Sequence, residues 1–520
     1  MSRLAAILCL TTALVVGIAL RCDGLGTRSL WFDEASSYTY ATQFGWEEMA
    51  ARAARNVHPP LSYALLRLWT AAFGDSPIGL RSLSVALAGV TIVGTFLLGR
   101  DAYRFNRDPT VERDATARGI GVTAAALVAV ASYQIVWSQQ ARMYSLGTAL
   151  TAFSSWTLLR AIESRSASGR WWAIYAVLAA ALLYTHNYGL FSVFGQGLFF
   201  AGYAALSTYR GDRAALRTCL RGAAAFIAAG LLYLPWVPAL LGQTGRVIEG
   251  YWTRPIEWMT IPATWYELFF PRDDLIEPGR TAILVWAALS VVVLPAFVRR
   301  GRAGEWLLLA VAITPFACAA GFSLAIAPII TTRYFLFAQI GVFCAIANMI
   351  WRYAGRPSVR TALIALLLAD EGYLHSLYRA DLNTVERTGM RGLAEHVLRY
   401  GAPNEPIIVV HPNLYHTARY YLRGKTDPRL FLGDRIPTHW QAAPFLTQGD
   451  FITQAELNGL PDRRIWVVGA ASGNTAMPTA WQANPGSTAM FPETFRFLRE
   501  VYVTAYERRS QAALHSSDGT

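Results

Sequence analysis

The feature that most constrains this chain is a series of apolar runs, each close to 20 residues long, that recurs up to about residue 377. A helix of roughly 20 residues crosses the hydrocarbon core of a membrane, with its backbone polar groups hydrogen-bonded internally. The composition agrees, because 54% of the 520 residues are hydrophobic and only 15% are charged. We therefore predict an α-helical polytopic membrane protein with about eleven spans, at residues 4–20, 78–99, 119–137, 143–160, 171–185, 189–206, 222–241, 281–298, 305–325, 334–351 and 361–377.

The chain carries a formal net charge of +12, almost all of it from arginine, since Lys425 is the only lysine. A basic excess can indicate nucleic-acid binding, but these arginines are concentrated in short connections between apolar runs. That distribution is typical of the cytoplasmic side of a membrane protein. We therefore exclude nucleic acid as a partner and predict a cytoplasmic N-terminus. The basic clusters all fall on one side of the predicted membrane: Arg100/Arg104/Arg107/Arg113/Arg118, Arg160/Arg165/Arg170, Arg210/Arg213/Arg217/Arg221, Arg299/Arg300/Arg302 and Arg352/Arg356/Arg360.

The N-terminal region and the cysteines narrow the class further. Residues 1–20 resemble a signal peptide, but no Ala-x-Ala cleavage site follows, so we interpret them as an uncleaved first span. The polar loop at 21–77 that comes next contains two stretches expected to be interfacial helices, 36–54 and 61–73. The five cysteines are scattered without paired spacing, which predicts neither a disulfide framework nor a cysteine metal site.

The composition changes after about residue 377, where Asn, Asp, Pro, His and Thr become common and no run is long enough to span a membrane. We expect two domains, with spans in 1–377 and a small soluble α/β domain in 378–520 on the extracytoplasmic side. Short apolar runs predict strands at 407–410 and 465–468, and 414–422 is expected to be a helix. The tail after Arg508 is expected to be disordered.

Asp33 and Glu34 form an acidic pair in the first polar loop, next to Trp31 and Phe32. A carboxylate close to hydrocarbon is costly, and an ionised Asp can accept a proton from a hydroxyl group at neutral pH. We interpret Asp33 as a catalytic base and Glu34 as the residue that orients it. The alternative is that Asp33 caps a helix or lies in a solvated loop.

Further polar residues fall at predicted extracytoplasmic span ends. His58 precedes Pro59 and Pro60, which stiffen the backbone, although the same motif is typical of a helix start. Arginine at a membrane surface often only reaches toward lipid headgroups. Three of them on the side opposite the basic clusters are less expected, and guanidinium groups bind phosphate well. We therefore expect His58, Arg81, Arg142 and Arg333 to bind a phosphate.

The sequence Thr185-His186-Asn187-Tyr188 is a polar connection between two spans, either a simple turn or one wall of a sugar pocket. No Walker motif, His-Glu-x-x-His or Gly-x-Ser-x-Gly is present. An Asp-x-Asp motif, the usual handle for a metal-bound nucleotide sugar, is also missing from the loops. Its absence favours a donor other than a nucleotide sugar.

Taken together, these residues resemble the GT-C glycosyltransferases. More narrowly, they resemble a family of protein mannosyltransferases that use dolichyl-phosphate-mannose, bacterial aminoarabinose transferases and Rgt-type lipopolysaccharide sugar transferases. The matching pieces occur in family order over about 300 residues. They are Phe32-Asp33-Glu34, Val57-His58-Pro59-Pro60-Leu61, Phe73 to Arg81, Gln140-Ala141-Arg142-Met143-Tyr144-Ser145, Tyr184-Thr185-His186 and Arg333-Tyr334.

The resemblance implies an inverting transfer of one sugar from a polyprenyl-phosphate donor to a glycolipid, envelope glycan or protein. The transfer would take place on the extracytoplasmic face of a bacterial inner membrane. Asp33 matches the family's catalytic acid, and Arg142 and Arg333 match its donor-phosphate ligands. We expect Tyr144, His186, Tyr188 and Tyr334 to line the substrate pocket. No cofactor is expected.

Aminoarabinose transferases have an acidic residue and a lysine before Pro-Pro-Leu, where this chain has Val57 and His58, so the sequence does not support a bridging metal. Two other classes remain open: a transporter or flippase of lipid-linked sugars, and a non-catalytic scaffold that binds glycan. A transporter would place charged or broken helices near the membrane midplane. Apart from Asp370 and Glu371, the predicted spans lack such groups.

Overall fold

The computed structural model describes residues 1–106, 110–164, 169–211, 213–270, 279–299, 302–382, 388–424, 426–433, 435–441, 443–461, 463–471, 481–492 and 500–508. The predicted tail after Arg508 and three arginines of the basic clusters, Arg107, Arg165 and Arg300, lie outside these ranges. The chain forms two compact units. The helical unit comprises Met1–Asp23, Val57–Trp69 and Gly79–Arg379, and the sheet unit comprises Gly24–Asn56, Thr70–Ile78 and Ala380–Thr520.

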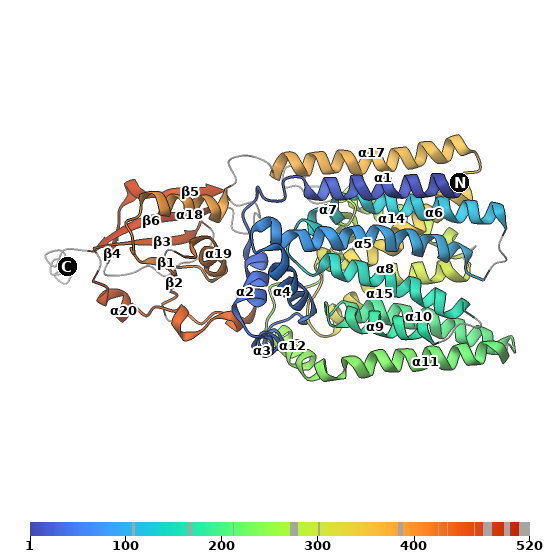
Figure 1. The fold of residues 1–520 in the computed structure, drawn as a ribbon, viewed down its shortest axis with the longest axis horizontal. Helices are drawn as coiled ribbons and strands as arrows, with labels where there is room; N and C mark the ends of the chain where they lie inside the picture. Colours follow the sequence, from blue (N-terminus) through green and yellow to red (C-terminus); the bar gives the residue numbers. More distant parts are fainter. Residues whose placement is uncertain are drawn as a thin grey trace. The chain divides into compact units, whose positions relative to one another are not determined.

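The predicted spans all fall on helices (Figure 1). The range 119–137 covers two helices, and 222–241 continues from one helix into α12 (Val237–Glu249). Besides α12, the helices that carry the predicted spans are α1 (Arg3–Cys22), α5 (Pro77–Arg104), α6 (Val111–Val130), α7 (Ser132–Ser138), α8 (Tyr144–Glu163), α9 (Arg170–Leu183), α10 (Gly189–Tyr209), α11 (Arg213–Tyr233), α14 (Arg280–Arg299), α15 (Ala303–Ala325), α16 (Leu336–Tyr353) and α17 (Pro357–Leu382).

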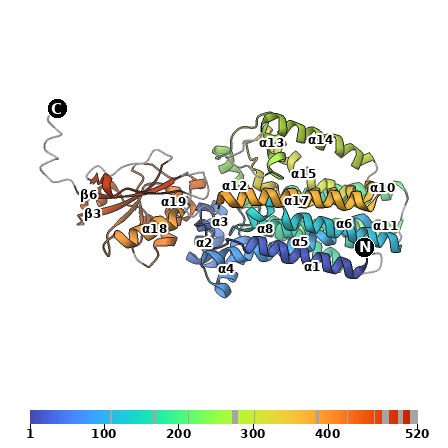
Figure 2. The same ribbon diagram turned by 90° about the horizontal axis from the view of Figure 1, so that it is seen from above.

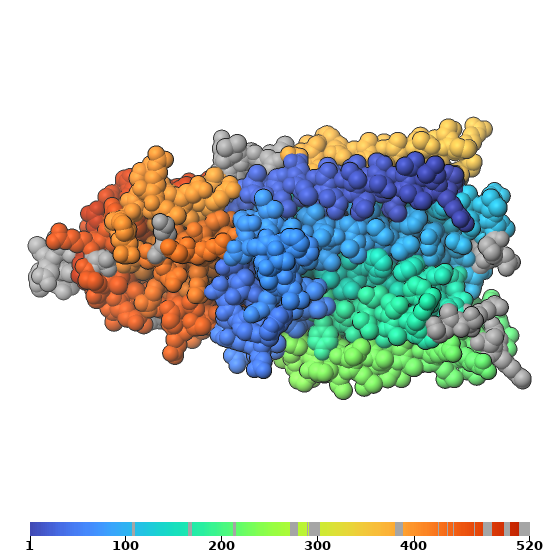
Figure 3. Space-filling model, in the orientation of Figure 1, coloured from blue at the N-terminus to red at the C-terminus, as the bar shows by residue number. Residues whose placement is uncertain are grey.

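Six helices in the described part of the chain are long and apolar enough to cross a membrane. The pair α6 and α7, bent by 59°, is a seventh if it forms one span. The prediction of a multi-pass helical membrane protein is confirmed, while the count of about eleven spans stays a prediction. Figure 3 shows α1 and α11 at the surface of the helical unit, where they expose apolar side chains suited to lipid. These are Leu4, Ile7, Leu8, Val15 and Val16 of α1 and Leu216, Leu220, Ile227 and Leu231 of α11.

Several basic connections of the helical unit gather at one end of it. The Met1 amino group donates to Ala115 O, and Arg118 Nε donates to Met1 O. The guanidinium group of Arg302, which precedes α15, lies 5.7 Å from the ring of Tyr103 near the end of α5. The expectation that these connections share one side therefore agrees with the structure, whereas the orientation of that side in a membrane stays a prediction.

The break between α6 and α7 is held by two buried polar side chains, Arg21 and Glu371. Arg21 donates to the carbonyl oxygens of Val128 (3.0 Å) and Ala129 (2.7 Å) at the end of α6. Glu371 accepts the backbone N–H of Ser132 at the start of α7 (2.8 Å). The Arg21 cation at the C-terminus of α6 also opposes the negative end of that helix dipole. The two side chains also bond to backbone groups that a bend leaves without intrahelical partners.

The sheet unit contains strands in the order β2-β1-β3-β6-β4, with β5 paired to β6. β1, β2 and β3 are parallel to one another, and β6 is antiparallel to β3. The bounds are β1 (Ile407–Val409), β2 (Arg429–Leu430), β3 (Arg464–Ala470), β4 (Trp481–Ala483), β5 (Ala489–Pro492) and β6 (Glu500–Arg508), with helices α18 (Gly389–Tyr400), α19 (Pro412–Leu422) and α20 (Gln454–Gly459) (Figures 1 and 2). The two predicted strands and the predicted helix are confirmed.

Alternate residues of β1 face opposite sides of the sheet, as the strand period of two requires. Ile407 and Val409 pack with side chains of α18 and α19, including Leu393 and Leu414. The residue between them, Ile408, instead packs with Leu457 of α20 and others on the opposite face. The unit therefore has a helix layer on each side of a mixed sheet, which is the α/β domain that the sequence predicts.

The first polar loop supplies two helices to the sheet unit, α2 (Phe32–Gln43) and α3 (Trp46–Arg55), followed by α4 (Leu61–Phe73). The prediction of α4 is confirmed, but the single helix predicted at 36–54 is wrong. The chain is extended at Phe44, and Gly45 is the N-cap of α3. Glycine has low helix propensity and is common at an N-cap, so the break has a local cause.

We predict that Glu371→Ala lowers the stability of the purified protein by about 1–2 kcal/mol, because the buried N–H of Ser132 loses its acceptor. Glu371→Gln keeps an oxygen acceptor and should lose less. Thermal unfolding in detergent, followed by intrinsic tryptophan fluorescence, measures both. Equal midpoints for the wild type and Glu371→Ala would contradict this role for the carboxylate.

Candidate functional site

Two connections of the helical unit bring His58 and His186 together. The backbone N–H of Leu61 donates to Tyr184 O (3.1 Å), and the Asn187 side chain donates to Val57 O (3.0 Å). The stiff Pro59-Pro60 segment is thereby tied to the turn between α9 and α10. The two imidazole rings, both buried, lie with their centroids 5.0 Å apart. The simple-turn interpretation of 185–188 therefore misses a contact with a segment more than 120 residues away.

Aromatic side chains surround this pair. The ring of Tyr334 lies 4.6 Å from His186 and 5.1 Å from Tyr188 between centroids, and Tyr144 stacks on Tyr334 at 6.4 Å. The hydroxyl groups of Tyr251 and Tyr334 are 3.0 Å apart, and Tyr188 donates to a backbone carbonyl, Ile329 O (2.7 Å). The sequence prediction that Tyr144, His186, Tyr188 and Tyr334 belong together thus matches their placement. Their role in lining a substrate pocket stays a prediction.

Two arginines adjoin the aromatic cluster. Arg333 lies in a short 3₁₀ helix, Thr332–Phe335, with its guanidinium carbon 5.5 Å from the ring centroid of Trp137 and 5.1 Å from that of Trp252. Arg142 is buried in the turn after α7, and the Ser84 hydroxyl donates to its carbonyl (3.3 Å). The turn that carries Arg142 thus lies one short helix, α7, after the α6–α7 break described above.

Arg81 is buried on α5, one turn before Ser84. The hydrogen bond from Ser84 to Arg142 O therefore connects its helix to the turn that carries Arg142. The segments that carry Arg81, Arg142 and Arg333 therefore lie in the helical unit, at the same end as His58 and His186. Their predicted role as phosphate ligands stays a prediction.

His186 is held as a neutral imidazole of one tautomer. Its Nδ1 accepts the backbone N–H of Tyr188 (3.1 Å), so the ring proton resides on Nε2. Burial, together with the positive charges of Arg142 and Arg333, lowers the pKa of His186 to about 3. The same arginines, His186 and, most of all, burial lower the pKa of His58 well below its usual value. Among the described residues, His186 Nε2 has no hydrogen-bond partner and thus offers a donor.

Asp33 and Glu34 belong to the sheet unit, in the first turn of α2. Glu34 is buried, and Asp33 is partly exposed. Asp33 is not the helix cap, because Trp31 takes that position and Asp33 follows inside the helix. Both carboxyl groups therefore lie at the end of α2 where a helix dipole attracts negative charge.

Other residues of the cluster were not singled out from the sequence: Trp137, Tyr251, Trp252 and Glu267. Glu267 accepts a hydrogen bond from the Thr332 hydroxyl (2.6 Å), next to Arg333. Trp137 lies near the end of α7, five residues before Arg142, and aromatic residues at span ends are a signal that could have found it. Within the described ranges, no group of three or more His, Cys, Asp or Glu side chains is placed to hold a metal ion.

No protein-family model and no curated protein matches the sequence. Among solved structures, the chain is similar to ArnT, an aminoarabinose transferase from Cupriavidus metallidurans, bound to undecaprenyl phosphate, with a TM-score of 0.57 and 13% identity over 97% of this chain and 98% of that chain. The apo state of the same protein matches with a TM-score of 0.57 and 14% identity over 96% and 97% of the two chains. This chain has the GT-C fold. The expected fold is therefore confirmed, and at these identities the similarity of the GT-C chains concerns the fold alone.

We predict that His186 makes stability fall as the pH is lowered. Its folded pKa of about 3 lies below the unfolded value of about 6.5. The unfolded chain thus binds more protons between these values, and the free energy of unfolding should drop by about 2 kcal/mol at pH 5. His186→Asn keeps an acceptor for the Tyr188 N–H and should remove this part of the pH dependence.

The measurement is thermal unfolding of both proteins in detergent at pH 7 and pH 5. Other buried histidines titrate in both proteins, so the difference between them isolates His186. An identical pH dependence in His186→Asn would show that the imidazole is not held neutral.

Proposed function

We propose that this protein is a GT-C membrane glycosyltransferase that transfers one sugar from a polyprenyl-phosphate donor to an extracytoplasmic glycolipid, envelope glycan or protein. The observation that carries the proposal is the convergence of Arg142 and Arg333 on the buried, neutral pair His58 and His186. Two fixed cations in a buried aromatic cluster attract an anion strongly, because little water screens them. A similar fold has been solved with undecaprenyl phosphate bound, which is a ligand of this class.

The reaction gains most from charge stabilisation at the departing phosphate. As the bond between sugar and phosphate breaks, negative charge grows on the phosphate oxygens, where Arg142 and Arg333 form charge-assisted hydrogen bonds. His186 Nε2–H adds a neutral donor without adding a positive charge. In this proposal Tyr144, Tyr188 and Tyr334, whose rings pack against one another, form an apolar wall beside a sugar ring or the first isoprene unit.

Asp33 is the proposed general base. When the acceptor hydroxyl attacks the anomeric carbon from the side opposite the phosphate, its proton passes to the Asp33 carboxylate and the configuration inverts. Glu34, the next residue in the same helical turn, orients Asp33. The steps assigned to these residues require no metal. In this proposal the protein lies in a bacterial inner membrane, with a cytoplasmic N-terminus and an extracytoplasmic sheet unit.

We predict that Asp33→Asn lowers transfer by a factor of about 10²–10⁴, because the amide does not accept the acceptor proton. Mass spectrometry of membrane glycolipids and envelope glycans compares cells that lack the gene with cells that carry each variant. Glu47→Gln, which removes an exposed carboxylate of α3 in the same unit, is the matched control and should restore the full product. The base assignment fails if Asp33→Asn also restores it at equal protein level.

We predict that Arg142→Gln and Arg333→Gln each weaken binding of undecaprenyl phosphate by about 10- to 100-fold, the loss of a charge-assisted hydrogen bond. Binding to the purified protein is measured by the ligand-induced shift of its unfolding midpoint. Arg254→Gln, an exposed arginine two residues after Trp252, serves as the control and should bind like the wild type. If all three variants bind equally, the arginine pair is not the phosphate site.

A further inference from the structure

The α2 helix, which carries Asp33 and Glu34, depends on contacts from the C-terminal part of the sheet unit. It has only 12 residues, fewer than an isolated helix needs to be stable in water. Yet every residue from Glu34 to Ala41 is buried. Its placement is therefore set by the surfaces around it. One of these is α19, which follows β1 almost 370 residues later in the chain.

Several interactions join the first loop to α19. The Leu30 N–H donates to the hydroxyl of Tyr421 (2.7 Å), just before α2 begins. In the middle of the helix, the rings of Tyr38 and Tyr420 meet edge to face at 4.9 Å between centroids. Farther along, Thr39 Oγ1 lies 3.3 Å from His416 Nδ1. These α19 residues lie within two turns of the helix and fix α2 along its length.

The contact between Thr39 and His416 has a defined direction. The Thr39 hydroxyl donates its only hydrogen to Ala35 O (2.9 Å), one turn back in α2. Its oxygen therefore accepts from His416, and the His416 proton resides on Nδ1. Burial lowers the pKa of His416 to about 4, so the ring is neutral at neutral pH. His416 is thus a fixed donor that holds α2 about two turns after Asp33.

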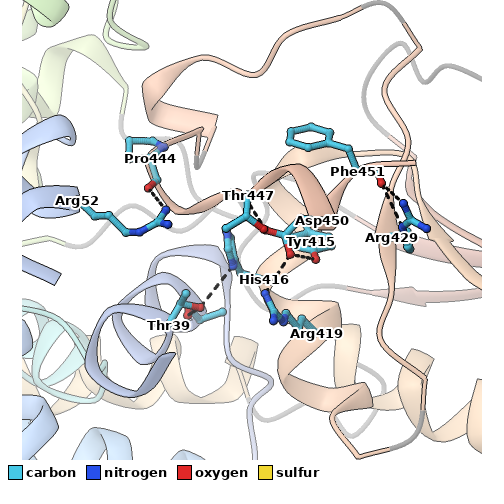
Figure 4. Close-up of polar contacts among 11 residues, drawn as sticks. Thr39, Arg52, Tyr415, His416, Arg419, Arg429, Pro444, Thr447, Asp450 and Phe451 are labelled. Atoms are coloured by element: carbon cyan, nitrogen blue, oxygen red, sulfur yellow. Dashed lines mark hydrogen bonds and ion pairs between the residues drawn. The ribbon is translucent and has the colours of Figure 1, made fainter. Parts of the chain in front are cut away.

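A network around Asp450 holds α19 in turn (Figure 4). The buried Asp450 carboxylate accepts from the Tyr415 hydroxyl (2.6 Å), from Arg419 (3.1 Å) and from both the backbone and the hydroxyl of Thr447 (2.7 and 2.9 Å). Tyr415 is the neighbour of His416 in α19. The carboxylate therefore ties the helix to the turn at 447–450 on both sides of His416.

The segment before that turn, which contains Pro444 and Phe445, also contacts α2 and α3. The ring of Phe445 lies 5.2 Å from His416 and 4.2 Å from Tyr40 between centroids. Arg52 of α3 donates to Pro444 O (2.9 Å), as Figure 4 shows. The first loop thus packs against side chains from two separate parts of the C-terminal sequence. Such contacts specify one position for α2 rather than only shielding it from water.

We propose that His416 is a positioning residue for sugar transfer. Through its hydrogen bond to Thr39 it fixes the position of α2, so that the C-terminal part of the sheet unit determines the position of Asp33. This inference rests on the proposed function of Asp33. A base must be held within hydrogen-bond reach of the proton that it accepts, and small displacements of a catalytic group are costly in rate. His416 itself does not contact the reacting atoms in this proposal.

The test compares His416→Phe, which keeps a ring but loses the donor, with His416→Asn, whose amide N–H replaces Nδ1–H. Purified variants are added to membranes from cells that lack the gene, and the initial rate of product formation is followed by mass spectrometry. We expect His416→Phe to lower the rate about tenfold, within the range for a misplaced catalytic group. His416→Asn should recover most of it. Binding of undecaprenyl phosphate should be unchanged in both variants.

Thr39→Val probes the same bond from the other partner and keeps the shape of the side chain. It should lower the rate as His416→Phe does, and the double variant should be no slower than either single one. His396→Phe replaces a histidine of α18 that packs against Tyr400 and Trp466, and serves as the control with a wild-type rate.

The outcomes separate this inference from the function on which it rests. If Asp33→Asn is inactive while His416→Phe and Thr39→Val keep the wild-type rate, the positioning role is refuted and the proposed base stands. If Asp33→Asn is fully active, the proposed function fails. Additive losses in the double variant, no rescue by His416→Asn, or weaker undecaprenyl phosphate binding in step with the rate would indicate general destabilisation and overturn the positioning role.

Discussion

Hydrocarbon allows no unpaired backbone group, and the helical unit is organised by that constraint. Long apolar helices satisfy it by themselves, so polar side chains are needed only where a helix is interrupted. The break between α6 and α7 shows the consequence. Arg21 and Glu371 form hydrogen bonds to backbone groups on its two sides. The turn after α7 carries Arg142. The side chains that hold the break therefore also help to position a residue of the candidate site.

In the candidate site, two guanidinium groups lie near a buried pair of neutral histidines. The Tyr188 N–H holds His186 in one tautomer, and burial, helped by the nearby arginines, keeps the ring neutral. An imidazolium there would repel the guanidinium groups, whereas a neutral imidazole donates a hydrogen bond without cost in charge. The aromatic rings around the pair exclude water. A cluster of this kind favours an anionic group joined to an apolar one, which describes a polyprenyl phosphate.

Much of the fold could be predicted because its signals are local. A run of 20 apolar residues is visible in any window, as are the strand at 465–468 and the helix start at Leu61. The error at 36–54 has a local cause as well, since Gly45 separates two helices. The membership of the first loop in the sheet unit had no such signal. It depends on pairs such as Thr39 and His416, which are 377 residues apart.

The sequence alone determined the class of protein, the position of its long apolar helices and the residue types that could bind phosphate, because hydropathy and charge act through short-range periodicity and composition. Only the tertiary structure decided that His58 and His186 meet, which tautomer His186 adopts, and that Glu371 caps α7. Each of these depends on the direction of one side chain toward a backbone or ring brought close by the packing of distant helices. Side-chain direction follows from that packing and leaves no periodic trace in the sequence.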